Sequence, residues 1–257
     1  MPTSLGAHSA RVEFARELLT KKGRREHARF SFEGPTLLAD AIAAGTQIEC
    51  VYATGAAYEE SRTVRDAEAR GVPVYVVDER TMRRISDVET PAGVIAVAPI
   101  ALFAAAELLD EPGLVLALAD LNDPGNAGTL LRTAEAFGVT RVIFGSRGAE
   151  PHLPKVVRAA MGAIFRLRLA VATPADLNAV LADWEVTGLA ARGEPLGRLA
   201  WHRKALLAVG NERRGLEGWE PLCGRFAAIP MAGGAESLNA GVAGSIALYE
   251  ASKHLSD

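Results

Sequence analysis

The sequence predicts an α/β protein with parallel strands. Strand-like apolar runs alternate with helix-like segments along most of the 257 residues, which is the pattern of α/β folds. Three of these runs, at 114–121, 206–210 and 226–229, are short and almost entirely apolar, as expected of strands buried on both faces. Each run leads into a polar loop that contains glycine. Because ligands bind outside the carboxyl ends of strands in open α/β sheets, these three loops are the first candidates for a site.

The composition is that of an ordinary globular chain. It is 49% hydrophobic and 23% charged, with a net charge of -3, so bulk charge does not indicate nucleic acid as a partner. Cys50 and Cys223 form no CxxC pair, and the five histidines lack metal-ligand spacing. We therefore expect no metal site and a reducing compartment. The first ten residues do not resemble a signal peptide, and the apolar run near 98–109 is too short to span a bilayer. These features predict a cytoplasmic protein with no membrane association.

The first half reads as a small α/β unit. A helix-like segment at 12–19 is broken by the sequence KKGRRE. Pro35 stands where a helix begins, and Gly45 ends it. The expected strands are 29–34, 48–54, 74–77 and 94–98, and the further helices are 58–71 and 79–85. Residues 99–113 form a connection whose clearest break is EPG. We expect one domain over residues 1–105 and a second over 106–257.

The second half alternates in the same way. Helices are expected near 128–137, from Pro154 to Met161, and after the cap Thr173-Pro174. The expected strands are 114–121, 141–145, 165–171, 186–190, 206–210 and 226–229. The chain shows no internal repeat, no GxGxxG and no GxxxxGK[ST].

The last 25 residues of this alternation, 229–253, predict a strand end, a tight loop and a closing helix. Pro230 ends the strand, Gly233-Gly234 permits a sharp turn, and Ser237 or Asn239 can cap the helix. Large apolar residues at helical spacing give the helix one apolar face: Leu238, Val242, Ile246 and Tyr249.

Small residues make the rest of this helix thin: Ala240, Gly241, Ala243, Gly244 and Ala247. Each glycine costs a helix about 1 kcal/mol relative to alanine, so two of them require a reason. Close approach of another helix, a partner subunit or a ligand is one reason. Dense packing in the core is the plainer alternative.

Three motifs carry the functional interpretation. Taken alone, DPGNAG is a strand-to-helix turn with Arg132 further along the helix, and GNERRGL is a surface turn. In the order DPxNxGxxxRTAxAFG, GxExxGL and IPMxGxxxSLN, they resemble the three motifs of the SpoU (TrmH-type) branch of the SPOUT RNA methyltransferases. The matching residues are Asn126, Gly128, Arg132, Thr133, Gly138, Gly210, Glu212, Gly215, Leu216, Ile229, Pro230, Met231, Gly233, Ser237, Leu238 and Asn239. Two departures are Ala240-Gly241, where the family more often has Val-Ser, and Asn211, where another small polar residue is common.

The resemblance covers residues 114 to 254 and implies fold, cofactor and partners together. It implies S-adenosylmethionine as methyl donor and the ribose 2'-hydroxyl of RNA as acceptor. It also implies an α/β/α second domain with a mostly parallel sheet and a trefoil knot, and a homodimer with the site near its interface. The first domain, in which a basic run leads into FSFEGPTLLADA, is similar to the small RNA-substrate domain that often precedes this core.

The resemblance also assigns roles to residues. We expect Arg132 to grip a neighbouring phosphate and stabilise the developing alkoxide. A role as general base is sometimes proposed for this family, but a guanidinium gives up its proton only at high cost. Glu212 and Ser237 would hold this geometry, and Asn126 and Asn239 would line the site. The expected cofactor-binding residues are Leu189, Ala190, Gly210, Asn211, Ile229, Met231 and Leu238.

The basic run in the first domain is the expected RNA contact. Between Arg11 and Arg29 there are seven basic and three acidic residues, a local balance of +4. The residues expected to contact RNA phosphate are Lys21, Lys22, Arg24, Arg25 and Arg29. The alternative is an ordinary solvated helix end.

The sequence leaves several alternatives for function. We expect ribosomal RNA rather than transfer RNA as substrate, because the first domain resembles small RNA-binding domains. A transfer RNA methyltransferase and a non-catalytic RNA-binding or assembly protein are the alternatives. An oxidoreductase is opposed by the missing glycine fingerprint. The modified nucleotide, and whether the product confers antibiotic resistance, are open.

Overall fold

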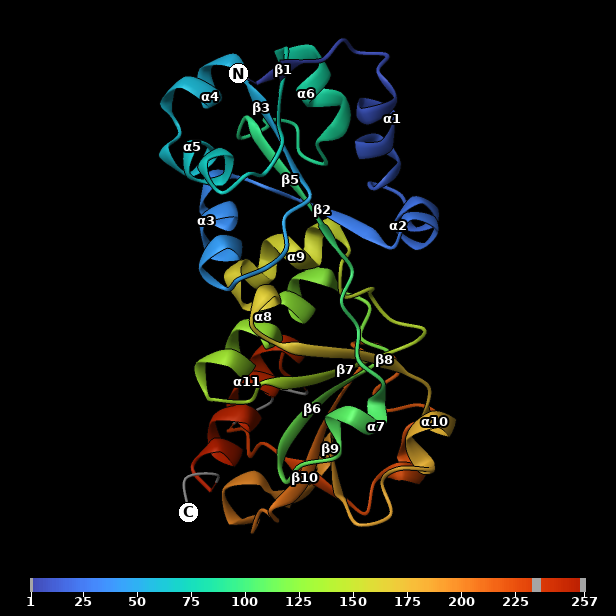
Figure 1. Ribbon diagram of the computed structural model, residues 1–257. Coiled ribbons are helices and arrows are strands. Elements are labelled where there is room, and N and C mark those ends of the chain that lie inside the picture. The colour runs from blue at the N-terminus through green and yellow to red at the C-terminus, as the bar shows by residue number, and fades with distance from the viewer. Residues whose placement is uncertain (1, 233–236, 255–257) are drawn as a thin grey trace. The chain divides into compact units, whose positions relative to one another are not determined.

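The computed structural model describes residues 2–232 and 237–254. The chain forms two compact units (Figure 1). The first unit contains the residues up to Ile100 together with His152–Arg158, and the second contains 101–151 and the residues from Ala159 onward. The domain division expected from the sequence, 1–105 and 106–257, stays a prediction.

The first unit is built on a five-stranded mixed sheet with the order β1-β4-β3-β5-β2. Its strands are β1 Thr3–Ser4, β2 Arg29–Glu33, β3 Cys50–Thr54, β4 Val74–Val77 and β5 Val94–Pro99. Strand β5 runs antiparallel to β2 and β3, and the other pairings are parallel. Its helices are α1 Ala10–Glu17, α2 Lys21–His27, α3 Pro35–Ala43, α4 Gly55–Glu60, α5 Arg62–Ala69 and α6 Glu79–Ile85. Helices α1 and α6 cover one face, where Leu18, Tyr52 and Met82 lie in a common core.

The second unit is an α/β/α sandwich around a six-stranded sheet with the order β11-β9-β10-β6-β7-β8. Its strands are β6 Gly113–Ala119, β7 Arg141–Gly145, β8 Arg168–Ala172, β9 Glu185–Pro195, β10 Lys204–Gly210 and β11 Arg225–Ala228. Every pairing described in this sheet is parallel. The carboxyl ends of these strands therefore meet at one edge, as the sequence predicted for three of them.

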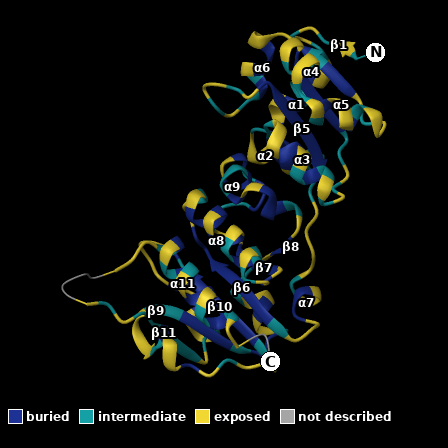
Figure 2. Cartoon of the chain, turned by 90° about the vertical axis from the view of Figure 1, so that its left-hand side faces the viewer, coloured by how far each residue is buried: buried dark blue, intermediate teal, exposed yellow. Residues whose placement is uncertain are grey.

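Helices cover both faces of this sheet (Figure 1). They are α7 Ala105–Leu108, α8 Pro124–Ala136, α10 Pro174–Asn178 and α11 Ala240–Ser252. Helix α9, Pro154–Ala160, belongs to the first unit up to Arg158. Helices α8 and α11 pack together on one face, and α7 and α10 pack on the other, where Leu108 and Leu177 join the strand core. The strands of both units are largely buried, and exposed residues lie mainly on the helices and loops (Figure 2).

Three helical segments differ from the sequence-based expectation. The run KKGRRE was predicted to break a helix, but it forms α2, which the Thr20 side chain caps by accepting from the Gly23 amide at 3.0 Å. A Cβ on Gly23 would lie 2.1 Å from the carbonyl oxygen of Glu17, so this glycine permits close packing of α1 and α2. The predicted single helix at 58–71 is divided at Ser61, whose hydroxyl caps α5. The expected connection at 99–113 contains the short helix α7.

Candidate active site

A cavity of about 510 Å³ opens at the carboxyl ends of β10 and β11 and beside residues 189–191 in the middle of β9. This volume is typical of small-molecule sites. All seven residues predicted to bind the cofactor line it, together with the predicted catalytic residues Glu212, Ser237 and Asn239. The wall also contains five residues that were not predicted: Ala191, Val209, Gly215, Ala240 and Ala243. The predicted turn at Gly233-Gly234 lies outside the described residues.

Glu212 joins the loop after β10 to the start of α8. Its Oε1 accepts from the Asn126 side-chain amide at 2.9 Å and from the Asp123 backbone amide at 3.3 Å. Asp123 is the N-cap of α8, and its Oδ1 accepts from the Asn126 amide at 2.7 Å. Asn126 is therefore held at both its backbone and its side chain. The first two motifs, which lie about 86 residues apart in sequence, meet at this carboxylate.

Asn211 shapes the loop on the other side of Glu212. Its Oδ1 accepts from the amides of Arg213 and Arg214, and its backbone pairs with Gly215 in both directions. A Cβ on Gly210 would lie 2.5 Å from the Gly215 backbone, so glycine is required at position 210 for this tight return. The loop GNERRGL is thus a closed turn that presents Glu212 to the cavity.

Asn239 caps α11 and faces the same cavity. Its Oδ1 accepts from the Val242 amide at 3.2 Å, whereas the alternative cap, Ser237, lines the cavity wall without capping the helix. The glycines of α11 allow close packing on α8 and β10. A Cβ on Gly241 would lie 3.0 Å from Asn126 Oδ1, and one on Gly244 would lie 2.6 Å from the Leu130 side chain.

The cavity wall suits S-adenosylmethionine in its chemistry. Leu189, Ile229 and Leu238 supply apolar surface of the kind that packs against an adenine ring. Glu212 supplies a carboxylate, which attracts the cationic sulfonium. Ser237 and Asn239 supply hydrogen-bonding groups at the start of α11. Among the described residues there is no cluster of side chains that could hold a metal ion.

Comparison with known proteins identifies the family of this chain. Residues 113–249 match the SpoU rRNA Methylase family, and residues 9–96 match the MRM3-like substrate binding domain. The chain belongs to the SpoU methylase family. The predicted family, the predicted α/β fold and the predicted enzyme class, an S-adenosylmethionine-dependent RNA 2'-O-methyltransferase, are thereby confirmed.

Individual relatives extend over both units. The chain is 29% identical over 249 residues to the 23S rRNA (guanosine(2553)-2'-O)-methyltransferase RlmP of Bacillus subtilis, covering 95% of this chain and 96% of that one. It is 31% identical over 215 residues to the 23S rRNA (uridine(2479)-2'-O)-methyltransferase of Streptomyces viridochromogenes, covering 76% and 70% of the two chains. A crystal structure of an AdoMet-bound rRNA methyltransferase from Sinorhizobium meliloti superimposes with a TM-score of 0.87 at 29% identity, covering 98% of each chain. The predicted cofactor is confirmed for this SpoU methylase.

Arg132 stands apart from the other predicted catalytic residues within one chain. It is exposed on α8 and is not among the residues that line the cavity. The face of α8 that packs on α11 carries Leu130 and Thr133, and the Thr133 hydroxyl lies 2.9 Å from that of Ser245. Residue 132 is about 100° around the helix from residue 133, so its side chain leaves from the flank of that packed face.

The residues predicted to bind RNA divide into two groups. Lys21, Lys22 and Arg25 are exposed on α2. Arg24 is only 3% exposed, and its Nη1 donates to the carbonyl oxygens of Leu18 and Leu19 at 3.0 Å each. Arg29 is partly exposed, pairs with Glu49 and donates to the carbonyl oxygen of Ala28. In this structure Arg24 and Arg29 hold the fold of the first unit, and the exposed cations are those of the other three residues.

The two thiols are unsuited to nucleophilic chemistry. Burial raises the pKa of the Cys50 thiol to about 11, and it raises the pKa of Cys223 to about 11 as well. Both thiols therefore stay protonated near neutral pH, and only the thiolate is a good nucleophile. Cys223 lies near the cavity-forming strands, where its Sγ would be 2.9 Å from a Cβ on Gly188. The second unit thus has no activated thiol among its described residues to accept a methyl group.

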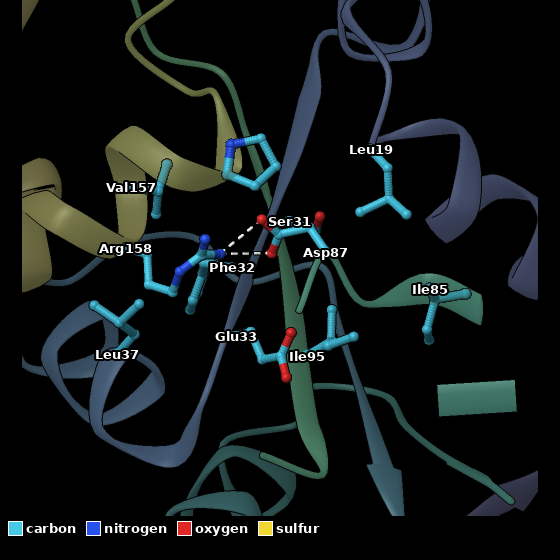
Figure 3. A pocket seen from close by; sticks show the side chains of 11 residues that line it. Leu19, Ser31, Phe32, Glu33, Leu37, Ile85, Asp87, Ile95, Val157 and Arg158 are labelled. Carbon is cyan, nitrogen blue, oxygen red and sulfur yellow. Dashed lines mark hydrogen bonds and ion pairs between the residues drawn. The ribbon is translucent and has the colours of Figure 1, made fainter. Parts of the chain in front are cut away.

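A second, much smaller cavity lies in the first unit (Figure 3). Its volume of about 10 Å³ is close to that of one water molecule, which excludes it as a cofactor site. Arg158 on its wall donates two hydrogen bonds to the Asp87 carboxylate, at 2.7 Å each (Figure 3). This charge-assisted pair fixes residues 152–158 to the first unit.

Within the described chain, no helix has both the length and the apolarity needed to cross a bilayer.

Proposed function

We propose that this enzyme methylates a ribose 2'-hydroxyl of ribosomal RNA and acts as a homodimer. The observation that carries the proposal is the convergence on one cavity of the loops after β10 and β11, the middle of β9 and the start of α11, with Asn126 bonded to Glu212 beside it. Both curated relatives described above are named as 23S rRNA 2'-O-methyltransferases, which supports ribosomal over transfer RNA. The same assignment supports the prediction that the protein works in the cytoplasm. The trefoil knot remains an implication of the family.

The residues that line the cavity orient the reacting groups rather than activate them chemically. When bound, S-adenosylmethionine supplies a methyl group on a positively charged sulfur. Leu189, Ile229 and Leu238 exclude water from one side of the cavity. Glu212 holds the Asn126 amide, so that Asn126 is oriented before RNA arrives. Orientation of this kind contributes several kcal/mol to the lowering of a reaction barrier.

The proposed dimer places Arg132 of the partner subunit at the cavity. The outer face of α11 is an exposed apolar stripe, with Val242 and Tyr249 each 48% exposed and Ile246 36% exposed. An exposed apolar stripe of this kind marks an interaction surface. Because α8 packs beside α11, a second copy seated on this stripe would bring its own α8, and therefore its Arg132, close to the first chain's cavity. There the guanidinium would bind an RNA phosphate and stabilise the developing alkoxide.

The first experiment tests Arg132 directly. In Arg132→Ala, we expect calorimetry to show unchanged affinity for S-adenosylmethionine, and methyl transfer to ribosomal RNA to be nearly abolished. Arg203→Ala, which removes an exposed arginine at the opposite edge of the sheet, is the matched control and should keep wild-type turnover. Turnover of Arg132→Ala close to wild type would remove this residue from the mechanism.

Mixed dimers test whether the site is shared. Co-purified dimers of Arg132→Ala with Glu212→Ala contain one site with both defects and one site with none, provided that Arg132 acts across the interface. We expect activity to reappear in the mixed dimers at a large fraction of one site's rate. If each Arg132 serves its own chain, every site carries a defect and the mixed dimers stay inactive.

The substrate is tested by offering both RNA classes. Purified enzyme is incubated with labelled methyl donor and with separate pools of unmodified ribosomal and transfer RNA. We expect label in ribosomal RNA, in an alkali-resistant dinucleotide, because a 2'-O-methyl group blocks cleavage of the adjoining bond. Label confined to transfer RNA would favour the alternative substrate, and the absence of label together with tight RNA binding would favour an assembly protein.

A further inference from the structure

Asp120 is a buried acidic residue that the catalytic proposal does not use. It follows directly after β6, is 3% exposed and has a φ of 53°, which is unusual for a residue other than glycine. Its Oδ2 accepts from the Trp219 indole nitrogen at 3.1 Å and from Arg147 Nη2 at 2.9 Å. Its Oδ1 accepts from the Arg147 backbone amide at 3.0 Å. A buried carboxylate with these partners is held in one position.

The loop after β7 packs closely against the Asp120 carboxylate. A Cβ on Gly145 would lie 2.4 Å from Asp120 Oδ1, and a Cβ on Gly148 would lie 2.6 Å from the Leu121 carbonyl oxygen. Both positions therefore require glycine for the observed approach. Between them stands Arg147, whose place above Asp120 is set by the backbone as well as by its side chain.

The Arg147 side chain is held by hydrogen bonds but is exposed to solvent. Its Nε and Nη2 donate to Asp120 Oδ2, at 3.1 and 2.9 Å, yet its side chain is 57% exposed. A guanidinium has five N–H donors, and these two bonds use two of them. Within residues 2–232 and 237–254 the guanidinium makes no other hydrogen bond, so three donors remain for a ligand on a side chain whose rotamer is already fixed. An arginine fixed in this way loses less conformational entropy on binding an anion than a freely rotating one.

Asp120 also connects this arginine to the edge of the cavity. The Asp120 carbonyl oxygen accepts from Asn211 Nδ2 at 2.9 Å, and Asn211 lines the cavity and shapes the loop that carries Arg213 and Arg214. Arg213 and Arg214 are both exposed. The strands β10, β6 and β7 are neighbours in the sheet, so the loops bearing these arginines lie in sequence along its carboxyl edge.

We infer that Arg147 is a phosphate contact for the RNA strand that enters the active site, and that Asp120 is its positioning residue. The inference rests on the proposed function, because it takes the ligand of this edge to be the RNA substrate. Phosphate oxygens suit the donors that remain on a half-anchored guanidinium. Arg213 and Arg214 would extend the same contact toward the cavity.

The salt dependence of RNA binding tests this inference without any methyl transfer. Binding of a fluorescein-labelled RNA hairpin of mixed sequence is measured by anisotropy over a series of salt concentrations. For Arg147→Gln we expect weaker binding and a slope of log K against log[salt] that is shallower by about 1, the value for one lost phosphate contact. Arg203→Gln changes the same charge at the amino end of β10 and should leave the slope unchanged.

A double-mutant cycle tests the role of Asp120. Asp120→Asn should weaken RNA binding in the wild-type background and have no further effect in Arg147→Gln, because it acts through the arginine. If Asp120 only supports the fold, the two effects on RNA binding add, and Asp120→Asn weakens S-adenosylmethionine binding as well. An Arg147→Gln slope equal to that of wild type would overturn the inference even if the enzyme methylates RNA. A shallower slope in a protein that methylates no RNA would keep the phosphate contact and refute the proposed function.

Discussion

The two units of this enzyme use their polar side chains differently. In the second unit, polar groups far apart in sequence meet at one sheet edge and fix each other, as in the bonds from Asn126 to Glu212 and from Asn211 to Asp120. In the first unit, the exposed cations of α2 lie on a helix surface, where Lys22 pairs with Glu26 at 3.6 Å. The comparison indicates that the proposed site is placed where side chains fix one another, whereas the predicted RNA contact on α2 would rely on solvated charge.

The strongest test of this difference removes the Glu212 carboxylate, which joins the first two motifs. In Glu212→Ala, we expect turnover to fall by a factor of about 100 to 1,000, the range found when one preorganised group is lost from an active site. Glu220→Ala removes an exposed carboxylate from the same inter-strand connection and should keep wild-type turnover. Single-turnover rates measure both variants, and a fall of less than threefold in Glu212→Ala would contradict the assigned role.

Tight packing around the motifs gives the next largest effect. A Cβ on Gly128 would lie 2.3 Å from Ala159 Cβ and 2.7 Å from the Ala160 amide nitrogen. We expect Gly128→Ala to lower the free energy of unfolding by about 1–3 kcal/mol through overpacking, although alanine favours a helix. Gly55→Ala, at the start of α4 in the first unit, meets no atom within 4 Å and should be neutral or stabilising. Denaturant unfolding of both variants measures the difference, and equal stabilities would refute it.

Two neighbours on α2 sharpen the comparison within the first unit. Arg24→Gln leaves the buried carbonyl oxygen of Leu18 and the partly buried one of Leu19 without their donor, so we expect a loss of about 1–3 kcal/mol of stability. Lys22→Gln should leave stability within about 0.5 kcal/mol and make the salt slope of RNA binding shallower by about 1. Thermal unfolding and anisotropy titrations check the pair, and an unchanged slope for Lys22→Gln would remove it from the RNA contact.

The smallest effect concerns alkaline pH. Burial raises the pKa of Cys50 and of Cys223 from 9.0 to about 11 in the folded chain, so the unfolded chain releases these protons first. The stability linked to the thiols is complete below pH 9 and is lost as pH rises from 9 to 11. Replacing both cysteines by alanine should weaken the dependence of the unfolding midpoint on pH between pH 9 and 11. A curve parallel to that of wild type would contradict these shifts.

Much of the fold was accessible from the sequence because local signals and burial agree. Near-continuous apolar runs gave β6, β10 and β11, and the expected helix at 79–85 matches α6. The run KKGRRE was predicted only to break the preceding helix, whereas it forms α2, in which Gly23 lies against the Glu17 backbone. That contact is tertiary and leaves no pattern in the local sequence. The break at Ser61 did carry a signal, since serine is a strong N-cap residue.

The candidate site was accessible to a similar degree. Motif resemblance located most of the residues that line the cavity, and several of these stand where β10 and β11 end at one edge of the parallel sheet. The Asp120–Arg147 pair was missed because it depends on which strands are neighbours, which the chain order of β6, β7 and β10 does not reveal. The sequence indicates this pair in one way: the charged residue Asp120 directly follows β6, a buried strand of seven residues. The exposure of Arg132 could not be predicted either, since helical spacing alone does not say which flank of α8 faces the cavity.

The apolar stripe on α11 has a consequence for how the enzyme behaves on dilution. In the homodimer proposed above, Val242, Ile246 and Tyr249 would be covered by the second copy, and folding and association would form one coupled equilibrium. The melting temperature would then rise with protein concentration, and very dilute samples would lose structure and catalysis together. The amount of enzyme in a cell would itself set how much of it is competent to work.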